Sequence, residues 1–273
     1  MTILITGAKG FVGNKIFTTC SGTAASPSLR GVTQTDIDRI IDESGADVIV
    51  HTAAISDMGA CEADPEASYK ANVELPVMLA KACRGRKLIC FSSDQVYNSC
   101  EEGGPYTEDT VNPGNTYSRH KLEMEQRVLD IDPDAVMVRA EWMYDFGAVR
   151  SNYMSIVLNA DELRFSTREY RGVTYVKEVA DNIANVIKLP GGAYNYGSET
   201  DRSIYEITRE FAEYIGKDIN LSDSPPGHNL WMDCSKARKY GVVFSNVLDG
   251  LKKCADDYGL SILPPPMTQP SLS

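Results

Sequence analysis

The fold of this chain is specified near the N-terminus by the glycine-rich stretch Thr6-Gly-Ala-Lys-Gly-Phe-Val-Gly13. An apolar run at residues 2–6 precedes it and predicts a buried strand, and a helical pattern over about 11–19 follows it. Glycine permits a tight turn here and lets backbone amides approach a pyrophosphate at the helix N-terminus. We therefore expect residues 7–13 to bind a dinucleotide; the alternative is a glycine-rich turn without a ligand.

Strand and helix patterns alternate along the rest of the chain. The predicted strands lie at residues 46–53, 87–91 and 135–140, whereas residues 21–30 make a poor second strand. The predicted helices lie at residues 36–44 (with Thr35 as N-cap and Gly45 as stop), 64–83, 116–129, 175–188 and 204–215. This alternation predicts an α/β fold, a Rossmann-type doubly wound parallel sheet with a smaller α/β substrate-binding lobe.

The regular pattern weakens after about residue 142, which predicts two lobes. We expect an NAD(P)-binding Rossmann domain over residues 1–145 plus about 173–202. The substrate-binding lobe then covers about 146–172 plus 203–262, and residues 263–273 form an exposed tail.

Composition indicates a soluble protein of the cytoplasm. The 273 residues carry a formal net charge of −11, and 42% of them are hydrophobic. So acidic a surface disfavours non-specific binding to nucleic acids and to anionic membranes. The seven cysteines are scattered without a Cys-x-x-Cys pair, which indicates reduced thiols, and the three histidines show no metal-ligand spacing. With no secretory signal at the start, we expect a cytoplasmic protein without a metal ion.

Charges near the glycine-rich stretch indicate which dinucleotide it prefers. The usual fingerprint has an acidic residue about 20 positions further on that binds the adenosine ribose. Residues 21–30 contain no acidic side chain, and the nearby charges are Lys9 and Arg30. Positive charge without a competing carboxylate suits a 2′-phosphate, so we expect NADPH, with NADH as the second choice. The alternative is that both cations are solvated surface charges.

A second signal is Tyr117-Ser-Arg-His-Lys121 at the start of a predicted helix. Positions i and i+4 share a helix face, so the Tyr117 phenol and the Lys121 ammonium can reach one site. A nearby cation lowers the pKa of a phenol, which can then exchange a proton with a carbonyl oxygen near neutral pH. Ser93 follows a predicted strand, where its hydroxyl could bond a substrate carbonyl; turn formation or helix capping is the alternative role for Ser92 and Ser93.

Together these features resemble the extended short-chain dehydrogenase/reductase family, over residues 1–150 and more loosely beyond. Within that family, the chain is most similar to the dTDP-4-dehydrorhamnose reductase branch. The stretches that carry this similarity are Ala54-Ile-Ser-Asp-Met-Gly-Ala-Cys-Glu62, Ser92-Ser-Asp-Gln-Val-Tyr97, Asn112-Pro-Gly-Asn-Thr-Tyr117, Arg139-Ala-Glu-Trp-Met-Tyr144 and Asn152-Tyr153. Gln95 stands where dehydratases of the wider family complete an Asp-Glu pair for elimination, which favours reduction.

The charges and the resemblance imply a role for each site residue. The implied catalytic triad is Ser93, Tyr117 and Lys121. The implied cofactor-binding residues are Gly7, Lys9, Gly10, Phe11, Val12, Gly13, Arg30, Ala53, Ala54, Tyr117 and Lys121. The implied substrate-binding residues are Asp94, Trp142 and Asn152. The chain is thus expected to be an NAD(P)H-dependent oxidoreductase that reduces a keto group on a nucleotide-linked sugar.

Two departures from the branch leave the exact substrate open. Val32 follows Gly31 where the reductases have an Asp that contacts adenine, and residues 225–232 lack the Arg and Ser that help build the nucleotide-sugar pocket. Two other functions stay open: an epimerase that keeps NAD bound, and a non-catalytic regulatory protein of this fold, like the subunit that binds methionine adenosyltransferase. Family members are often dimers, so a homodimer is a further expectation.

Overall fold

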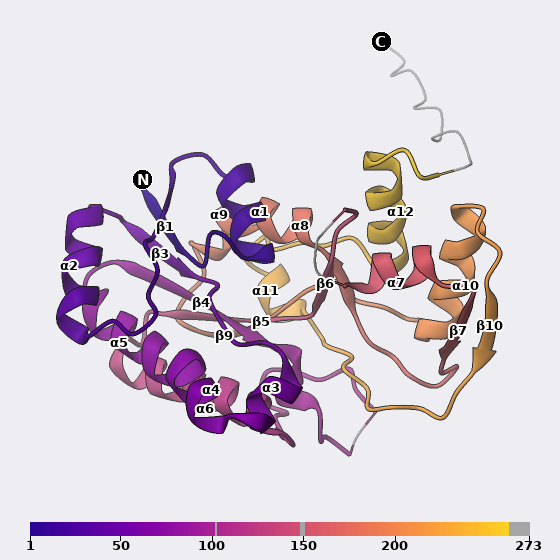
Figure 1. Cartoon of the computed structure of the whole chain (residues 1–273), viewed down its shortest axis with the longest axis horizontal. Coiled ribbons are helices and arrows are strands. Elements are labelled where there is room, and N and C mark those ends of the chain that lie inside the picture. The colour runs from indigo at the N-terminus through magenta and orange to yellow at the C-terminus, as the bar shows by residue number, and fades with distance from the viewer. Residues whose placement is uncertain (102, 148–150, 262–273) are drawn as a thin grey trace, which may run out of the picture.

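A six-stranded parallel sheet lies at the centre of the computed structural model, which describes residues 1–101, 103–147 and 151–261. The strand order is β2-β1-β3-β4-β5-β9 (Figure 1). The strands are β1 (Ile3–Thr6), β2 (Thr23–Ala25), β3 (Val48–His51), β4 (Lys87–Ser93), β5 (Val136–Ala140) and β9 (Gly192–Tyr196). The chain leaves β1 for β2 on one side and returns to β3 on the other. Doubly wound sheets bind ligands at such a reversal, beyond the carboxyl ends of the strands.

The central strands are buried, as a parallel sheet covered on both faces requires. Every residue of β1, β3 and β5 is buried, which explains why their apolar runs were recognisable in the sequence. β2 has only three residues and lies at the edge of the sheet, which explains the weak pattern at residues 21–30. The predicted α/β fold with a Rossmann-type parallel sheet is confirmed.

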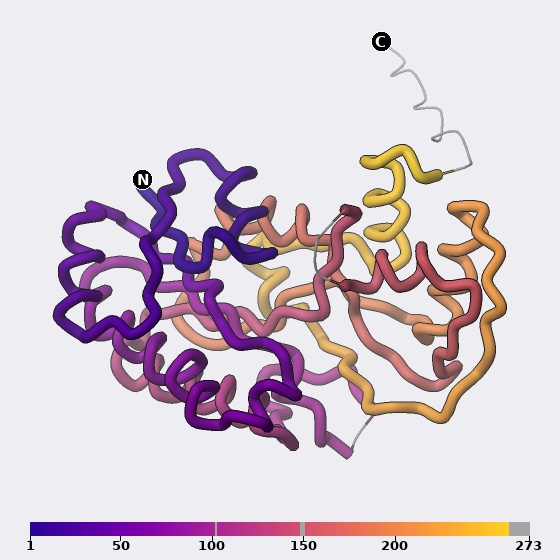
Figure 2. Tube along the Cα trace, viewed as in Figure 1, coloured from indigo at the N-terminus to yellow at the C-terminus, as the bar shows by residue number. Residues whose placement is uncertain are grey.

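Helices cover both faces of the sheet (Figures 1 and 2). On one face, α1 (Phe11–Thr19), α8 (Val176–Asp181), α9 (Ile183–Val186) and α11 (Ser235–Arg238) share a hydrophobic cluster with the strands. On the other face, the second cluster includes α2 (Gln34–Ser44), α5 (Leu75–Ala82) and α6 (Thr116–Ile131). α3 (Met58–Ala63) and α4 (Pro65–Tyr69) pack against α6. The two layers of helices thus fix the positions of the strands and of their carboxyl ends.

A smaller region is built mainly from the chain after β5. β6 (Trp142–Tyr144) pairs with β8 (Val173–Tyr175), and β7 (Glu162–Phe165) pairs with β10 (Asn220–Asp223). The helices α7 (Tyr153–Asn159), α10 (Ile204–Tyr214) and α12 (Val247–Asp257) share a third hydrophobic cluster with β6, β7 and β8. Figure 2 shows this region beside the sheet. The domain bounds expected from the sequence stay a prediction, and the expected tail at 263–273 lies outside the described residues.

The start of α2 differs from the sequence prediction. Its N-cap is Thr33 and not Thr35: the Thr33 hydroxyl accepts a hydrogen bond from the Asp36 amide. Asp36 in turn accepts one from the Thr33 amide, at 2.9 Å. Thr35, with Asp38 three residues later, offers the same pattern in the sequence, so only the structure distinguishes the two possible helix starts.

Two predicted helices are divided. The helix expected over residues 64–83 contains a π-helical turn, Lys70–Glu74, immediately before α5. Pro76 lies in the first turn of α5, and it has no N–H to donate to the preceding turn, so a regular α-helical ladder is interrupted there. The helix expected over residues 175–188 divides into α8 and α9.

Two kinds of structure are not found in the described part of the chain. None of the helices within it is long and apolar enough to cross a membrane. Across residues 1–101, 103–147 and 151–261, no group of three or more His, Cys, Asp or Glu side chains is placed to hold a metal ion.

Candidate active site

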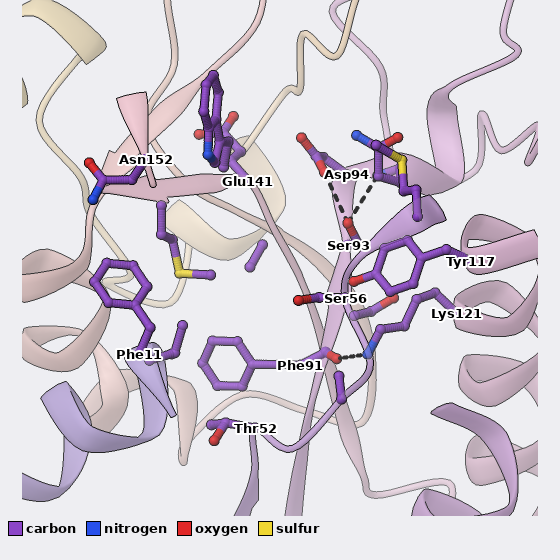
Figure 3. A pocket seen from close by; sticks show the side chains of 18 of the residues that line it. Phe11, Thr52, Ser56, Phe91, Ser93, Asp94, Tyr117, Lys121, Glu141 and Asn152 are labelled. Atoms are coloured by element: carbon purple, nitrogen blue, oxygen red, sulfur yellow. Dashed lines mark hydrogen bonds between the residues drawn. The ribbon is translucent and has the colours of Figure 1, made fainter. Parts of the chain in front are cut away.

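A cavity of about 530 Å3 lies where the carboxyl ends of β3, β4 and β5 meet the start of α1. Its walls come from segments far apart in the sequence, including α6, the chain after β5, and Arg171 and His228. In Figure 3, Ser93, Tyr117 and Lys121 lie on one side of this cavity, and Phe11 and Asn152 lie on the other. The glycine-rich loop and the expected triad therefore border one space.

The glycine-rich loop brings the start of α1 close to β1 and to the end of β3. Gly7 has φ = +79°, and a Cβ there would lie 2.8 Å from the Ala53 amide nitrogen. A Cβ on Gly13 would collide with the Gly7 carbonyl oxygen. Gly10 is the N-cap of α1 and offers no side chain to its first amides, so an anion can pair with them. The loop fits the pyrophosphate of a dinucleotide.

α6 carries Tyr117 and Lys121 to the cavity. Asn115 begins this helix, because its side chain accepts from the Ser118 amide while the Ser118 hydroxyl accepts from the Asn115 amide. Lys121 follows Tyr117 by one turn, with Nζ 5.8 Å from the centre of the tyrosine ring. Nζ donates to the Phe91 carbonyl oxygen of β4 at 2.7 Å. Burial lowers the pKa of Lys121 to about 8, so the side chain is charged at neutral pH.

Ser93 ends β4 on the same side of the cavity as Tyr117 (Figure 3). Its hydroxyl donates to Asp94 Oδ1 at 3.0 Å and accepts from the Gln95 amide at 3.2 Å, which begins a 3-10 turn. Ser93 thus caps a turn, the alternative role considered from the sequence, and also lines the cavity. To donate to a substrate carbonyl, Ser93 must release Asp94, because a hydroxyl has one proton to donate.

A buried ion pair lies behind Ser93. Glu125 of α6 and Arg139 of β5 are 3% and 4% exposed, and Nη2 donates to Oε2 at 2.7 Å. The Ser92 hydroxyl also donates to Glu125, and Arg139 donates to the Tyr97 hydroxyl at 2.8 Å. Because both charges are fully bonded, the pair holds α6 against the strand ends that carry the site. Sequence reasoning missed this pair; the only available signal was an arginine within an apolar strand.

His51 is buried at the end of β3. Its Nδ1 lies 2.6 Å from the Thr6 hydroxyl, and its Nε2 has no partner among the described residues. Burial lowers the pKa of His51 to about 3, so the ring is neutral. These contacts describe a neutral, packed imidazole at the end of β3.

The part of the cavity beyond Ser93 is lined by two buried carboxyl groups and a cation. Asp94 and Glu141 are 3% and 4% exposed, and burial raises the pKa of both, that of Glu141 to about 8. Arg171 lies over the Trp142 ring, 5.2 Å from its centre, with Nη2 4.0 Å from Asp94 Oδ2. Asn152 lines the cavity too and is the N-cap of α7. The sequence signal for Glu141 was its charge beside a predicted buried strand.

Most of the expected site residues border the cavity. Those that line it are Gly10, Phe11, Val12, Gly13, Ala54, Ser93, Asp94, Tyr117, Lys121, Trp142 and Asn152. Four expected cofactor residues lie outside the lining. Gly7 and Ala53 pack against each other behind the loop, and Lys9 and Arg30 are exposed. The lining residues that the sequence analysis did not assign include Glu141, Arg171 and His228.

Comparisons with known proteins agree with this geometry. Residues 1–225 match the family described as RmlD substrate binding domain. The dTDP-4-dehydrorhamnose reductase of Mycolicibacterium smegmatis is 35% identical over 153 residues, which are 53% of this chain and 46% of that protein. The methionine adenosyltransferase 2 subunit beta of Xenopus tropicalis is 28% identical over 278 residues, covering 88% of this chain and 82% of that protein.

Solved structures share the fold. A dTDP-4-dehydrorhamnose reductase from Clostridium acetobutylicum superposes with a TM-score of 0.83 at 24% identity, covering 95% of this chain and 100% of the other. A dTDP-4-dehydrorhamnose reductase from Bacillus anthracis, solved in complex with NADP, gives a TM-score of 0.80 at 18% identity, covering 94% and 99%. At these identities the similarity shows the fold alone.

Proposed function

Because the chain belongs to the RmlD substrate binding domain family, we propose that it is an NAD(P)-dependent reductase of a keto group on a nucleotide-linked sugar. The family match confirms the resemblance to the dTDP-4-dehydrorhamnose reductase branch that the sequence motifs indicated. The observation that carries the proposal is the single cavity bordered by Ser93, Tyr117, Lys121 and the uncapped start of α1. A relative named as a dTDP-4-dehydrorhamnose reductase supports testing that keto sugar first.

The glycine-rich loop and α6 are the segments assigned to the cofactor. The first amides of α1, next to Gly10, would bind the pyrophosphate, and Lys121 would bind the ribose of the nicotinamide half. NADPH is favoured over NADH by the exposed cations Lys9 and Arg30, and the Bacillus anthracis neighbour was solved with NADP. When bound, the reduced nicotinamide supplies a hydride.

The triad residues supply the remaining chemistry. Tyr117 donates a proton to the carbonyl oxygen as the carbonyl carbon is reduced. Ser93 donates a hydrogen bond to the same oxygen once it has released Asp94. The Lys121 charge, one helical turn from Tyr117, stabilises the phenolate that proton donation leaves behind. The product is the corresponding alcohol.

The proposal is tested by following the loss of NADPH absorbance with dTDP-4-dehydrorhamnose as substrate. The expected result is consumption of NADPH that requires the keto sugar and is accompanied by formation of the alcohol. Bound NADPH that is never consumed with this or other nucleotide-linked keto sugars would contradict it.

One observation favours a second function. The methionine adenosyltransferase 2 subunit beta of Xenopus tropicalis matches 88% of this chain, so a relative named as the subunit of another enzyme spans most of the fold. As the alternative we propose a regulatory subunit that binds NADPH without consuming it and forms a stable complex with another enzyme. The epimerase alternative differs from both, since it would turn over without added reductant. The homodimer and the cytoplasmic location stay predictions.

A further inference from the structure

The cavity wall beyond Ser93 presents polar atoms without hydrogen-bond partners. Asp94 Oδ2, Gln95 Oε1 and Arg171 Nε are buried and unpaired within the described residues, and all three residues line the cavity. The Asp94 side chain is only 4% exposed. A buried polar group without a hydrogen-bond partner has lost its water and gained nothing in return, and native proteins leave few such groups. Their convergence on one wall indicates a ligand with several hydrogen-bonding groups.

Arg171 has two carboxylates near it but makes a hydrogen bond to neither. Its guanidinium packs over Trp142, and the carboxylate oxygens of Asp94 and Glu169 are each 4.0 Å away, beyond hydrogen-bond distance. Its side chain makes no hydrogen bond to the described residues, and it is 19% exposed. The planar donors of this guanidinium are therefore available to a ligand in the cavity.

Glu141 is fixed by backbone and side-chain donors at one oxygen only. Oε2 accepts from the Thr174 hydroxyl at 2.7 Å and from the Ser198 amide at 2.9 Å. Gly172 and Gly197 lie so close that a Cβ on either would collide with the carboxyl group. Oε1 accepts no hydrogen bond from the described residues. The surroundings thus hold one oxygen of Glu141 and leave the other for a ligand.

We propose that Glu141 and Arg171, together with Asp94, bind hydroxyl groups of the sugar ring next to the carbonyl that is reduced, and so determine substrate specificity. This inference rests on the proposed function. A hydroxyl donates to a carboxyl oxygen and accepts from a guanidinium, so adjacent ring hydroxyls can pair with all three residues. A protonated Glu141 suits this role as well, because it can also donate. A substrate without these hydroxyls leaves the buried groups unpaired.

The test compares kcat/KM for dTDP-4-dehydrorhamnose with that for its analogues lacking the 2- or the 3-hydroxyl. A site built to bond a hydroxyl discriminates strongly against its absence, so we expect the wild type to prefer the full substrate by about 100-fold or more. Glu141→Ala and Arg171→Met should each reduce this preference by at least about tenfold. The matched control is Arg168→Met, because Arg168 is an exposed arginine outside the cavity lining. A preference that is unchanged in either variant overturns the assignment of that residue.

A binding measurement separates failure of this inference from failure of the proposed function. In a Trp231→Phe background, Trp142 of the cavity is the only tryptophan, so its fluorescence reports binding of dTDP-rhamnose or dTDP without turnover. We expect dTDP-rhamnose to bind more tightly than dTDP, and this difference to vanish in Glu141→Ala and Arg171→Met. If no keto sugar is reduced but this pattern holds, the proposed function fails and the subsite stands. Equal binding of both ligands by the wild type overturns the subsite.

Discussion

The geometry around Lys121 allows its side chain to bind a ribose hydroxyl and to keep its charge near Tyr117 at the same time. An ammonium has three N–H donors, and the Phe91 carbonyl uses one of them. The remaining donors can bind a ribose hydroxyl while the charge stays one turn from Tyr117. Ser93, in contrast, has its single donor engaged with Asp94 and must rearrange when a carbonyl enters. Substrate binding is therefore expected to break the Ser93–Asp94 hydrogen bond.

The first residue-scale prediction concerns the Tyr117 hydroxyl. Tyr117→Phe removes the proton donor and keeps the ring, so kcat should fall by about 10²–10⁴-fold, while the Kd for NADPH stays within about twofold. Steady-state kinetics and fluorescence titration measure the two quantities. Tyr240→Phe, at an exposed tyrosine outside the cavity lining, is the matched control. Unchanged turnover in Tyr117→Phe would refute the assigned acid.

The second residue-scale prediction is a loss of activity at alkaline pH. Burial lowers the pKa of Lys121 to about 8, so the cation is present below that pH and is lost as the pH rises through it. We expect kcat/KM to fall above about pH 8. Burial also raises the pKa of Glu141 to about 8. The pH profile of kcat/KM for Glu141→Gln therefore distinguishes titration of Glu141 from titration of Lys121. If the fall at alkaline pH disappears in Glu141→Gln, the titrating group is not Lys121.

At the scale of elements, two glycines of the glycine-rich loop differ in role: Gly13 is needed for folding, whereas Gly10 is expected to lie beside the cofactor. Gly13 is required by the fold, because a Cβ there would collide with the Gly7 carbonyl oxygen. Gly10 has an extended backbone, φ −80° and ψ 169°, which other residues also adopt, and it is exposed. A Cβ on Gly10 would lie 3.1 Å from the Gly7 carbonyl oxygen, a tight contact but a milder one than at Gly13, and the side chain would also face the amides that a pyrophosphate needs.

Substitutions at these two glycines should therefore have different effects. Gly13→Ala is expected to lower the free energy of unfolding by about 1–3 kcal/mol through overpacking. Gly10→Val should lower thermal stability less than Gly13→Ala does, because its Cβ contact with the Gly7 carbonyl oxygen is longer, and it should abolish NADPH binding. Denaturant unfolding and NADPH titration of both variants provide the measurement. Normal NADPH binding by Gly10→Val would show that the pyrophosphate does not approach this turn.

Local sequence patterns were sufficient for the elements whose signals are contiguous. β1, α1 and α6 matched because an apolar run, a glycine turn and a Tyr-x-x-x-Lys spacing each act within a few residues. Thr33 is the N-cap of α2 because it forms reciprocal hydrogen bonds with Asp36. The prediction of Thr35, whose hydroxyl lies nearer the apolar pattern, was wrong. The π-helical turn before Pro76 lacks a local pattern that distinguishes it from an α-helical turn.

At the scale of the whole molecule, the acidic charge and the site have opposite effects on an anionic ligand. A net charge of −11 repels a dinucleotide phosphate, so binding depends on local donors and cations. Lys9 lies within the glycine-rich loop and is exposed. It is the loop's own positive charge, and we predict that it offsets this repulsion at a 2′-phosphate.

The prediction at this scale is selective weakening of NADPH binding. Lys9→Ala should weaken NADPH binding by about fivefold, which corresponds to the loss of about 1 kcal/mol of exposed charge pairing. The Kd for NADH should stay within about twofold. The wild-type preference should also shrink as salt is added. Lys239→Ala, which removes another exposed lysine charge, is the control. Equal losses for NADPH and NADH in Lys9→Ala would exclude a role in 2′-phosphate recognition.

Asp94, Trp142 and Asn152, which the sequence assigned to the substrate, line the cavity, but the rest of this wall could not be predicted, because it exists only in the folded chain. The sequence lacks the family's arginine and serine over residues 225–232, yet His228 of that stretch and the distant Arg171 both line the cavity. Glu141 joins them from beside β5, and its place depends on Thr174 and Ser198. These contacts join residues that lie far apart in the sequence, so no periodic sequence pattern marks them.

The most direct test of the central claim is to follow the hydride itself. NADPH deuterated at the transferable position of the nicotinamide is incubated with dTDP-4-dehydrorhamnose and the protein, and the sugar product is examined by mass spectrometry and NMR. The account predicts an alcohol with one deuterium on the former carbonyl carbon, formed at least about a hundredfold more slowly when Tyr117→Phe replaces the wild type. An unlabelled sugar beside unconsumed, bound NADPH would contradict a reductase and favour a regulatory subunit.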